Sequence, residues 1–441
     1  MDLHKNFTCL AALILAAGFS ANAQESSAWT LKKCLEHAHA NNLQIKQADI
    51  RIQECDYDKK QGIASLFPSI NASTSFGYSR QNIRNSLNEY MSDNTINARY
   101  NIGANMTVFN GFKQYNNLRQ QDLYSQLRQT DKEEVIFRLD LSIIQTYTQI
   151  AYLKENISVL ENSAASSKAQ LDLAEFKLKA GSISQSDCAQ IAAQYSNDRY
   201  QLVCGKNQLN EQLLKLKQLL EMGVDDVIDI VPYAMDTDLL LAPVPDKKRI
   251  YEQALQLLPS SRSQEINIQI AELNRRITTA GYSPTLSLSA SVGTGNWFDG
   301  NESFSTQLND NLNESIGLTL SIPVFNGLQT RTAVQKAKLN QQNVRLDKLT
   351  AEKELLNAIE SIYNDALAAQ SQYIQAQAQL EAAALSHRMV EEQFRQGLKN
   401  TVELLISDNA YLKASQNLLQ AKYTAAMAIQ LLQYYQWMPI E

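Results

Sequence analysis

The tetrapeptide Val-Phe-Asn-Gly occurs twice in this chain, at residues 108–111 and, 216 positions later, at residues 324–327. Each copy ends a stretch in which apolar and polar residues alternate, and each is followed by 69 residues without glycine or proline, 112–180 and 328–396. Alternation is typical of a β-strand, and a long run without helix breakers is typical of an α-helix. The sequence therefore predicts an internal duplication in which each half passes from a strand into a very long helix.

Two alternating segments precede each tetrapeptide, over about residues 70–79, 98–108, 286–293 and 312–322, with polar loops expected at residues 82–97 and 297–311. Their apolar residues have even numbers, and their polar face is Ser, Asn, Thr and Gly rather than Lys and Glu. Small uncharged polar side chains are typical of strands that face a water-filled lumen on one side and lipid on the other. The segments are expected to cross a membrane; a soluble β-sheet is the alternative.

Four strands are too few to close a membrane barrel, for which about eight are the minimum. A sheet left open in lipid would keep backbone N–H and C=O groups unpaired, at a cost of several kcal/mol each. The chain must then associate with copies of itself. Two copies would supply eight strands and three copies would supply twelve, and periodicity alone does not choose between them.

Each long helical run ends at a glycine, Gly181 or Gly397, and a second helical segment follows over about residues 184–222 and 400–437. Glycine in this place is typical of the left-handed turn that ends a helix. The sequence predicts two helical hairpins, each roughly 100 Å long at ~1.5 Å per residue. Apolar residues recur along one face, as in coiled coils, although no strict heptad is kept.

The remaining segments set the expected boundaries. A short apolar region followed by small residues predicts a signal peptide that is cleaved after Ala23. The expected parts are the signal peptide (1–23), the first repeat (24–222), a linker around the middle of the assembly (223–246), the second repeat (247–437) and a C-terminal tail (438–441).

Composition and motifs exclude several classes of function. The 441 residues carry a formal net charge of −6, whereas a nucleic-acid-binding protein would need a basic surface. The sequence contains no phosphate-binding glycine loop, no HExxH motif and no GxSxG motif, so we expect no enzyme activity, cofactor or metal. The cysteines of the mature chain are predicted to be free thiols: Cys34, Cys55, Cys188 and Cys204.

Taken in order, these elements resemble the TolC-like outer membrane efflux protein family over essentially the whole mature chain. The resemblance rests on Trp29-Thr30-Leu31, Phe67-Pro68, Leu178-Lys179-Ala180-Gly181, Ile322-Pro323-Val324-Phe325-Asn326-Gly327 and Phe394-Arg395-Gln396-Gly397. It implies an α+β membrane protein that forms a homotrimer. Each protomer would give four strands to one twelve-stranded β-barrel and its helices to one long periplasmic tunnel.

The resemblance also implies a location and partners. Members of the family are passive ducts in the outer membrane that dock to a periplasmic adaptor (membrane fusion) protein and to an inner-membrane pump of RND, ABC or MFS type. The expected function is therefore the exit duct of a tripartite efflux or type I secretion system. The alternative is an exported trimeric coiled-coil scaffold without a through-pore.

By the same resemblance, the hairpin tips close the channel. The candidate tip residues are Gly181 and Asp187 in the first repeat and Phe394, Gly397, Lys399 and Glu403 in the second. Glu403 matches the first of two acidic positions at the constriction, whereas the second position holds Ile406. A structural role is the alternative, because Asn400 with Glu403, and Ser184 with Asp187, have the spacing of a capping box.

The two tetrapeptides are expected to mark the change from strand to helix. The residues involved are Phe109, Asn110, Gly111, Pro323, Phe325, Asn326 and Gly327. Asparagine side chains can bond nearby backbone groups, and glycine can adopt dihedral angles that other residues avoid.

Overall fold

The structure is a computed structural model that describes residues 29–84, 90–231, 240–298 and 302–436. The predicted signal peptide with its cleavage site at Ala23 lies outside these residues. Residue 437 and the C-terminal tail (438–441) also lie outside them, as does part of the linker, residues 232–239.

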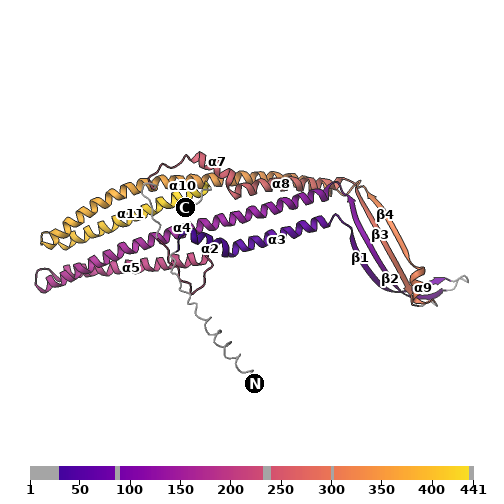
Figure 1. Cartoon of the computed structure of the whole chain (residues 1–441), viewed down its shortest axis with the longest axis horizontal. Coiled ribbons are helices and arrows are strands. Elements are labelled where there is room, and N and C mark those ends of the chain that lie inside the picture. Colours follow the sequence, from indigo (N-terminus) through magenta and orange to yellow (C-terminus); the bar gives the residue numbers. More distant parts are fainter. Residues whose placement is uncertain (1–28, 85–89, 232–239, 299–301, 437–441) are drawn as a thin grey trace, which may run out of the picture.

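Long helices form most of the described molecule (Figure 1). Helices α4 (Lys113–Lys179) and α10 (Gln329–Arg395) have 67 residues each, and α5 (Gln185–Leu219) and α11 (Thr401–Tyr435) run back along them. At ~1.5 Å per residue, α4 and α10 are each roughly 100 Å long. The prediction of two long helical hairpins is confirmed. Within the part of the chain that the structure describes, none of the helices is long and apolar enough to cross a membrane.

Shorter helices pack along the long ones, between the middle of the molecule and the sheet (Figure 1). They are α2 (Leu31–Asn41), α3 (Leu43–Ala64), α7 (Lys247–Leu257), α8 (Pro259–Thr279) and the 3-10 turn η1 (Ala280–Tyr282). Near the sheet, the helices contact one another in the order α3–α4–α8–α10, and toward the tips the order is α5–α4–α11–α10. The helices therefore form one layer, with α3 and α5 at one edge and α10 at the other.

The strands of the described residues form an antiparallel sheet at one end of the helical layer (Figure 1). The strand order is β1 (Ser69–Arg84), β2 (Tyr90–Phe109), β3 (Thr285–Trp297) and β4 (Asn313–Ser321). Up to a shift at Thr107, even-numbered residues pair with even-numbered residues: Ile70 with Ala104, Ala104 with Ala290, and Ala290 with Ile316. The predicted separation into an even face and an odd face is confirmed.

The two faces of this sheet differ in chemistry. Large apolar side chains of the even face are more than half exposed in the single chain: Ile70, Phe76, Tyr78, Ile102, Ile316 and Leu318. On the odd face, hydroxyl groups pair across strands, as between Ser291 Oγ and Ser315 Oγ at 2.8 Å. A contiguous exposed apolar face of this kind marks a surface that meets a membrane or another protein.

The described residues of both expected loops include regular secondary structure that the sequence did not predict. Strands β1 and β2 extend until Arg84 pairs with Tyr90, so most of residues 82–97 is strand rather than loop. The second expected loop, residues 297–311, contains helix α9 (Phe304–Asp310). Strand β3 extends beyond β4, and α9 and its flank supply the missing partners: Asn311 Nδ2 donates to Gly295 O (2.8 Å), and the Trp297 N–H donates to Gln307 Oε1 (2.7 Å).

The prediction that both tetrapeptides end a strand is wrong for the second copy. Strand β2 includes Phe109, but β4 ends at Ser321, before Pro323 and Phe325. Proline has no N–H to donate to a strand ladder, which ends the pairing at this point.

Two successive residues are left-handed at each tetrapeptide. The φ angles are +67° at Gly111 and +62° at Phe112, and +61° at Gly327 and +64° at Leu328. Glycine adopts this conformation freely, whereas a residue with a side chain is strained by ~1–2 kcal/mol. The sequence predicts unusual dihedral angles at the glycine, but it does not predict that the next residue is also left-handed.

The asparagine of each tetrapeptide bonds the first turn of the helix that follows. The Gln114 N–H donates to Asn110 Oδ1 at 3.2 Å, and Asn326 Nδ2 donates to Thr330 Oγ1 at 2.6 Å. Each asparagine therefore holds the residue four positions later, which fixes the direction in which the long helix leaves the sheet.

The described part of the linker packs into a core at the middle of the helical layer. Ile228 and Ile230 are buried in one cluster with residues of α2, α4, α5 and α11. The Tyr147 hydroxyl donates to Trp29 O at 3.0 Å and to Val231 O at 2.6 Å. The linker and Trp29, which lies just before α2, are thus both held to α4. In the same core Cys34 is fully buried, which raises the pKa of its thiol to about 12.

The close approach of Gly111 to Ser283 allows a test of the turn between β2 and α4. A Cβ added to Gly111 would lie 2.5 Å from Ser283 Cβ. Gly111→Ala should therefore combine left-handed strain of ~1–2 kcal/mol with overpacking of about 1–3 kcal/mol, and lower the thermal unfolding temperature in detergent followed by circular dichroism. The double variant Gly111→Ala/Ser283→Gly should regain the overpacking part. No recovery in the double variant would show that Ser283 is not the limiting contact.

Candidate functional site

The tips of both hairpins repeat one backbone turn. Gly181 and Gly397 are left-handed, with φ angles of +73° and +80°. The Ser182 N–H donates to Lys177 O at 2.9 Å, and the Leu398 N–H donates to Gln393 O at 2.8 Å. This bond closes the last turn of a helix around a left-handed glycine. Both glycines therefore shape the turn and carry no chemistry of their own.

A capping box begins the returning helix at each tip. In the first repeat the Asp187 N–H donates to Ser184 Oγ at 3.1 Å, and the Ser184 N–H donates back to Asp187 Oδ2 at 3.3 Å. In the second repeat the Glu403 N–H donates to Asn400 Oδ1 at 2.9 Å, and the Asn400 N–H donates to Glu403 Oε2 at 3.2 Å. Both acidic tip residues therefore bond the backbone of their own helix start.

The charge of Glu403 is balanced within its own tip. Lys399 Nζ donates to Glu403 Oε1. This hydrogen bond is the largest cause of a pKa of Glu403 below its ordinary value, and the hydrogen bond from the Asn400 N–H is the second. The pKa of Asp187 is also lowered, chiefly by the Ser184 hydroxyl and backbone and further by the Thr401 hydroxyl from the other hairpin.

Phe394 lies in the packing between the hairpins, not on an open surface. It is 6% exposed and clusters with Leu171, Ala174 and Ile191 of the first hairpin and Leu404 of the second. Lys177 Nζ lies 4.8 Å from the centre of the Phe394 ring. In the single chain Phe394 therefore packs between the hairpins.

The second tip exposes apolar side chains around one carboxylate. Ile406, at the position where the resemblance implies a second acid, is 65% exposed, and Leu398 and Val402 are 71% and 51% exposed. The structure therefore brings Lys399, Asn400 and Glu403 together at this tip and leaves Ile406 on the surface beside them.

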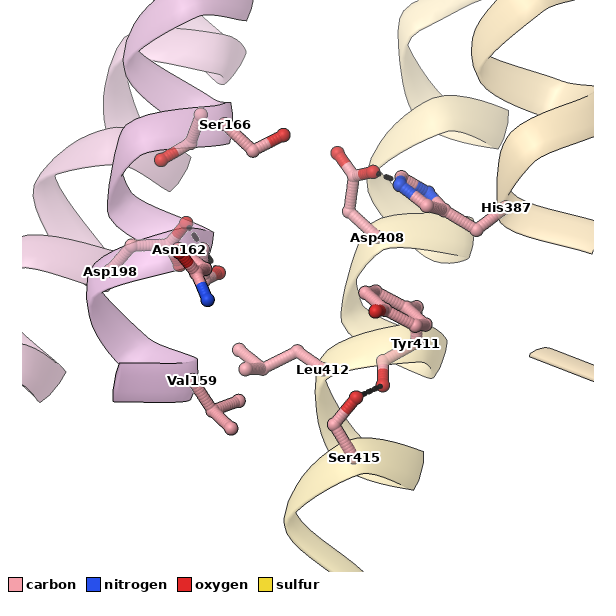
Figure 2. A pocket seen from close by; sticks show the side chains of 11 residues that line it. Val159, Asn162, Ser166, Asp198, His387, Asp408, Tyr411, Leu412 and Ser415 are labelled. Atoms are coloured by element: carbon pink, nitrogen blue, oxygen red, sulfur yellow. Dashed lines mark hydrogen bonds and ion pairs between the residues drawn. The ribbon is translucent and has the colours of Figure 1, made fainter. Parts of the chain in front are cut away.

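Sequence reasoning missed a polar cavity between the two hairpins. The cavity measures about 150 Å³, and its lining includes Asp198 of α5 and His387, Asp408 and Tyr411 of α10 and α11 (Figure 2). His387 Nδ1 lies 3.0 Å from Asp408 Oδ1, and the Tyr411 ring stacks on the imidazole with 5.0 Å between ring centres. An alignment of the two repeats at the 216-residue offset would have found this pair, because the first repeat has Leu171 and Ala192 at the equivalent positions.

Comparisons with known proteins agree in pointing to one family. A family model described as outer membrane efflux protein matches residues 34–221 and 250–434. The chain is 22% identical over 425 residues to outer membrane efflux protein BepC of Brucella suis biovar 1 (strain 1330), covering 95% of this chain and 88% of BepC. It is 23% identical over 350 residues to outer membrane protein TolC of Salmonella enteritidis, covering 73% of this chain and 70% of that protein.

The fold is also that of a solved structure. The chain superposes on CusC with a TM-score of 0.78 at 17% identity, over 92% of this chain and 91% of that chain. CusC forms a transmembrane channel. At this level of identity the likeness shows the fold alone.

The capping boxes predict that the tips respond to acid. A carboxylate with a lowered pKa stabilises the folded state fully above its pKa in the unfolded chain, ~4 for Glu, and this stability is lost as pH falls through the lower folded-state pKa. Amide hydrogen exchange in the first turn of α11, corrected for the intrinsic rate, should therefore accelerate below about pH 4. Glu403→Gln keeps the capping box but does not titrate. It should abolish the acceleration in α11 and leave that of α5, and persistence in α11 would contradict the assignment to Glu403.

Proposed function

The chain belongs to the outer membrane efflux protein family, and from this premise we propose that it is the passive exit duct of a tripartite efflux or type I secretion system. The observation that carries the proposal is the continuity of two structures in one chain. A sheet with an exposed apolar face passes, through the two tetrapeptides, into helices roughly 100 Å long. The sheet would cross the outer membrane, and the helices would extend through the periplasm.

Closure of the duct requires further copies of the chain. The sheet has four strands, and β1 and β4 are its edges in the described residues. Unpaired edge groups in lipid cost several kcal/mol each, so the edges must pair with other copies. We propose a trimer with a twelve-stranded β-barrel, the number that the family resemblance implies.

The internal repeat indicates which residues would meet between protomers. Within the chain, α4 and α8 form a groove lined by Leu123 and Leu273. The 216-residue offset maps these residues onto Leu339 of α10 and Tyr57 of α3. Leu273 is 6% exposed, whereas Tyr57 and Leu339 are 70% and 60% exposed. We propose that α10 of one protomer packs on α3 of the next and buries this second pair.

The surroundings of Gly111 and Gly327, the glycines of the two tetrapeptides, differ in the same way. Gly111 lies against Ser283, whereas nothing in the chain lies within 4 Å of a Cβ added to Gly327. The offset maps Ser283 onto Phe67, which is 67% exposed. Phe67 of a neighbouring copy is therefore the proposed partner of Gly327.

Disulfide trapping tests this interface. In a chain whose native cysteines are replaced by serine, Tyr57→Cys and Leu339→Cys together should yield a covalent trimer on a non-reducing gel. The matched pair Leu123→Cys and Leu273→Cys should form its bond within one chain and leave the mass unchanged. A ladder that stops at the dimer would contradict three copies, and no cross-link at all would contradict the proposed pairing of α3 and α10.

The proposed partners bind at the far end of the helices. We propose that the hairpin tips dock to a periplasmic adaptor, which connects the duct to an inner-membrane pump of RND, ABC or MFS type. Around a threefold axis, three copies of Glu403 would form an acidic ring that favours cations and repels anions. Lys399 would reduce the charge of this ring, because it pairs with Glu403.

Planar-bilayer recordings test both the duct and the role of Glu403. The purified protein should form cation-selective channels, and a protein that assembles but never conducts would rule out the duct. Glu403→Gln removes the charge while it keeps the capping box, so it separates two roles that an alanine substitution would mix. Reduced cation selectivity in Glu403→Gln would support the ring, and unchanged selectivity would leave Glu403 as a cap.

A further inference from the structure

The cavity between the hairpins contains carboxyl groups from both sides. Asp198 lies on α5 of the first hairpin and Asp408 on α11 of the second, on opposite walls of the cavity (Figure 2). His387 and Asp408 are ten and eleven residues from the tip glycine Gly397, which is roughly 15 Å along the helices at ~1.5 Å per residue. The cavity is thus close to the tips without being part of them.

The groups in the cavity are largely removed from water. The side chains of His387 and Asp408 are 15% and 17% exposed, and Asp198 is 3% exposed. Asp198 is satisfied by its neighbours, since Ser163 Oγ donates to Oδ2 at 3.3 Å and Gln194 Nε2 donates to Oδ1 at 2.9 Å. The groups that favour the ionised form of Asp408 are Gln170 and His387.

Every element that packs around Asp408 contributes to its electrostatic environment. Helix α4 contributes the uncharged Gln170, α5 contributes Asp198, and α10 contributes His387 and Glu391. Burial raises the pKa of Asp408, Gln170 and His387 oppose this rise, and Glu391 and Asp198 add to it. Two further carboxyl groups therefore oppose the ionisation of Asp408, although Arg395 already pairs with Glu391 at 2.8 Å.

The first repeat shows that hairpin packing does not require these groups. Leu171 and Ala192 occupy the positions equivalent to His387 and Asp408, and they belong to an apolar cluster between the hairpins. A buried ion pair is weak support for stability, because well-packed apolar residues at the same place are often equally stable or more so. The pair in the second repeat therefore calls for a role other than packing.

We propose that the His387–Asp408 pair is a proton-sensitive latch that sets how closely the α10–α11 hairpin lies against the α4–α5 hairpin. When Asp408 is ionised, it repels the Asp198 carboxylate on the opposite hairpin, and the cavity must open to water. When Asp408 is protonated, this repulsion is lost and the two walls can approach.

The sign of the response follows from burial. A buried acid with a raised pKa favours the closed arrangement at low pH, and that preference is lost as pH rises through the raised pKa. The hairpins should therefore lie closer in acid and separate toward neutral and alkaline pH. In the proposed duct this motion would be passed to the tips through Phe394 and Leu404, which pack against the first hairpin.

Distance measurements between spin labels test the latch without any requirement for conduction. Labels at Asn197→Cys on α5 and Arg388→Cys on α10 use exposed positions at the level of the cavity, in a chain without native cysteines. Labelled protein is diluted with unlabelled chain before assembly, so that each assembly carries one labelled copy. Because the pKa of Asp408 is raised above the ordinary Asp value of ~4, the mean distance should be longer at about pH 8 than at about pH 4.

Substitutions at the cavity assign the shift to Asp408. Asp408→Asn fixes a neutral side chain of the same shape and should give the short distance at both pH values. The double variant His387→Leu/Asp408→Ala reproduces the first repeat and should do the same. Glu391→Gln removes a nearby carboxyl group that is already paired, and it should keep the shift of the unmodified protein.

Three results would overturn the latch: a distance that does not change with pH, a shift that persists in Asp408→Asn, or a shift that disappears in Glu391→Gln. These results are independent of the proposed duct. A protein that conducts ions but shows no shift would refute the latch alone. A protein that shows the shift but does not conduct would refute the duct alone.

Discussion

The unpaired backbone groups at the two edges of the sheet are the constraint on which the rest of this architecture depends. A four-stranded sheet with an apolar face cannot remain open in lipid, because each unpaired N–H or C=O costs several kcal/mol there. Assembly is therefore a condition of membrane insertion. The same requirement operates on a smaller scale within the chain. Where β3 extends beyond β4, the residues around α9 bond the exposed groups of Gly295 and Trp297.

Because the chain is duplicated, each residue of one repeat can be compared with the equivalent residue of the other. The two repeats share the left-handed tetrapeptide corner, the tip glycine and the capping box, so these features are demanded by the backbone path. The places where the repeats differ carry other information. Exposed Tyr57 and Leu339 occupy the positions equivalent to Leu273 and Leu123, which line one groove within the chain, and this points to contacts between copies. His387 and Asp408 stand where Leu171 and Ala192 are apolar, which points to a role in addition to packing.

Much of the fold could be predicted from the sequence because it depends on short-range periodicity. Even-numbered apolar residues define one face of a strand, and glycine-free runs define the long helices, whatever their neighbours are. Features that depend on pairing partners were missed. Helix α9 is needed because β3 extends beyond β4, which only the register reveals. The left-handed Phe112 and Leu328 contradict the local preference of residues with a side chain, so the sequence pattern did not predict them.

The tip illustrates the same limit for the candidate site. The spacing of Asn400 and Glu403 was sufficient to predict the capping box, because both partners lie in one turn. The burial of Phe394 was not predictable, since it depends on Leu171 and Ile191 from a hairpin more than 200 residues away in sequence. A cap and an acidic ring use different parts of Glu403. The cap uses its hydrogen bonds to the backbone, and a ring would use its net charge, which Lys399 already reduces in this chain. Glu403 therefore stabilises the start of its helix, and it would contribute only a moderate charge to the proposed ring.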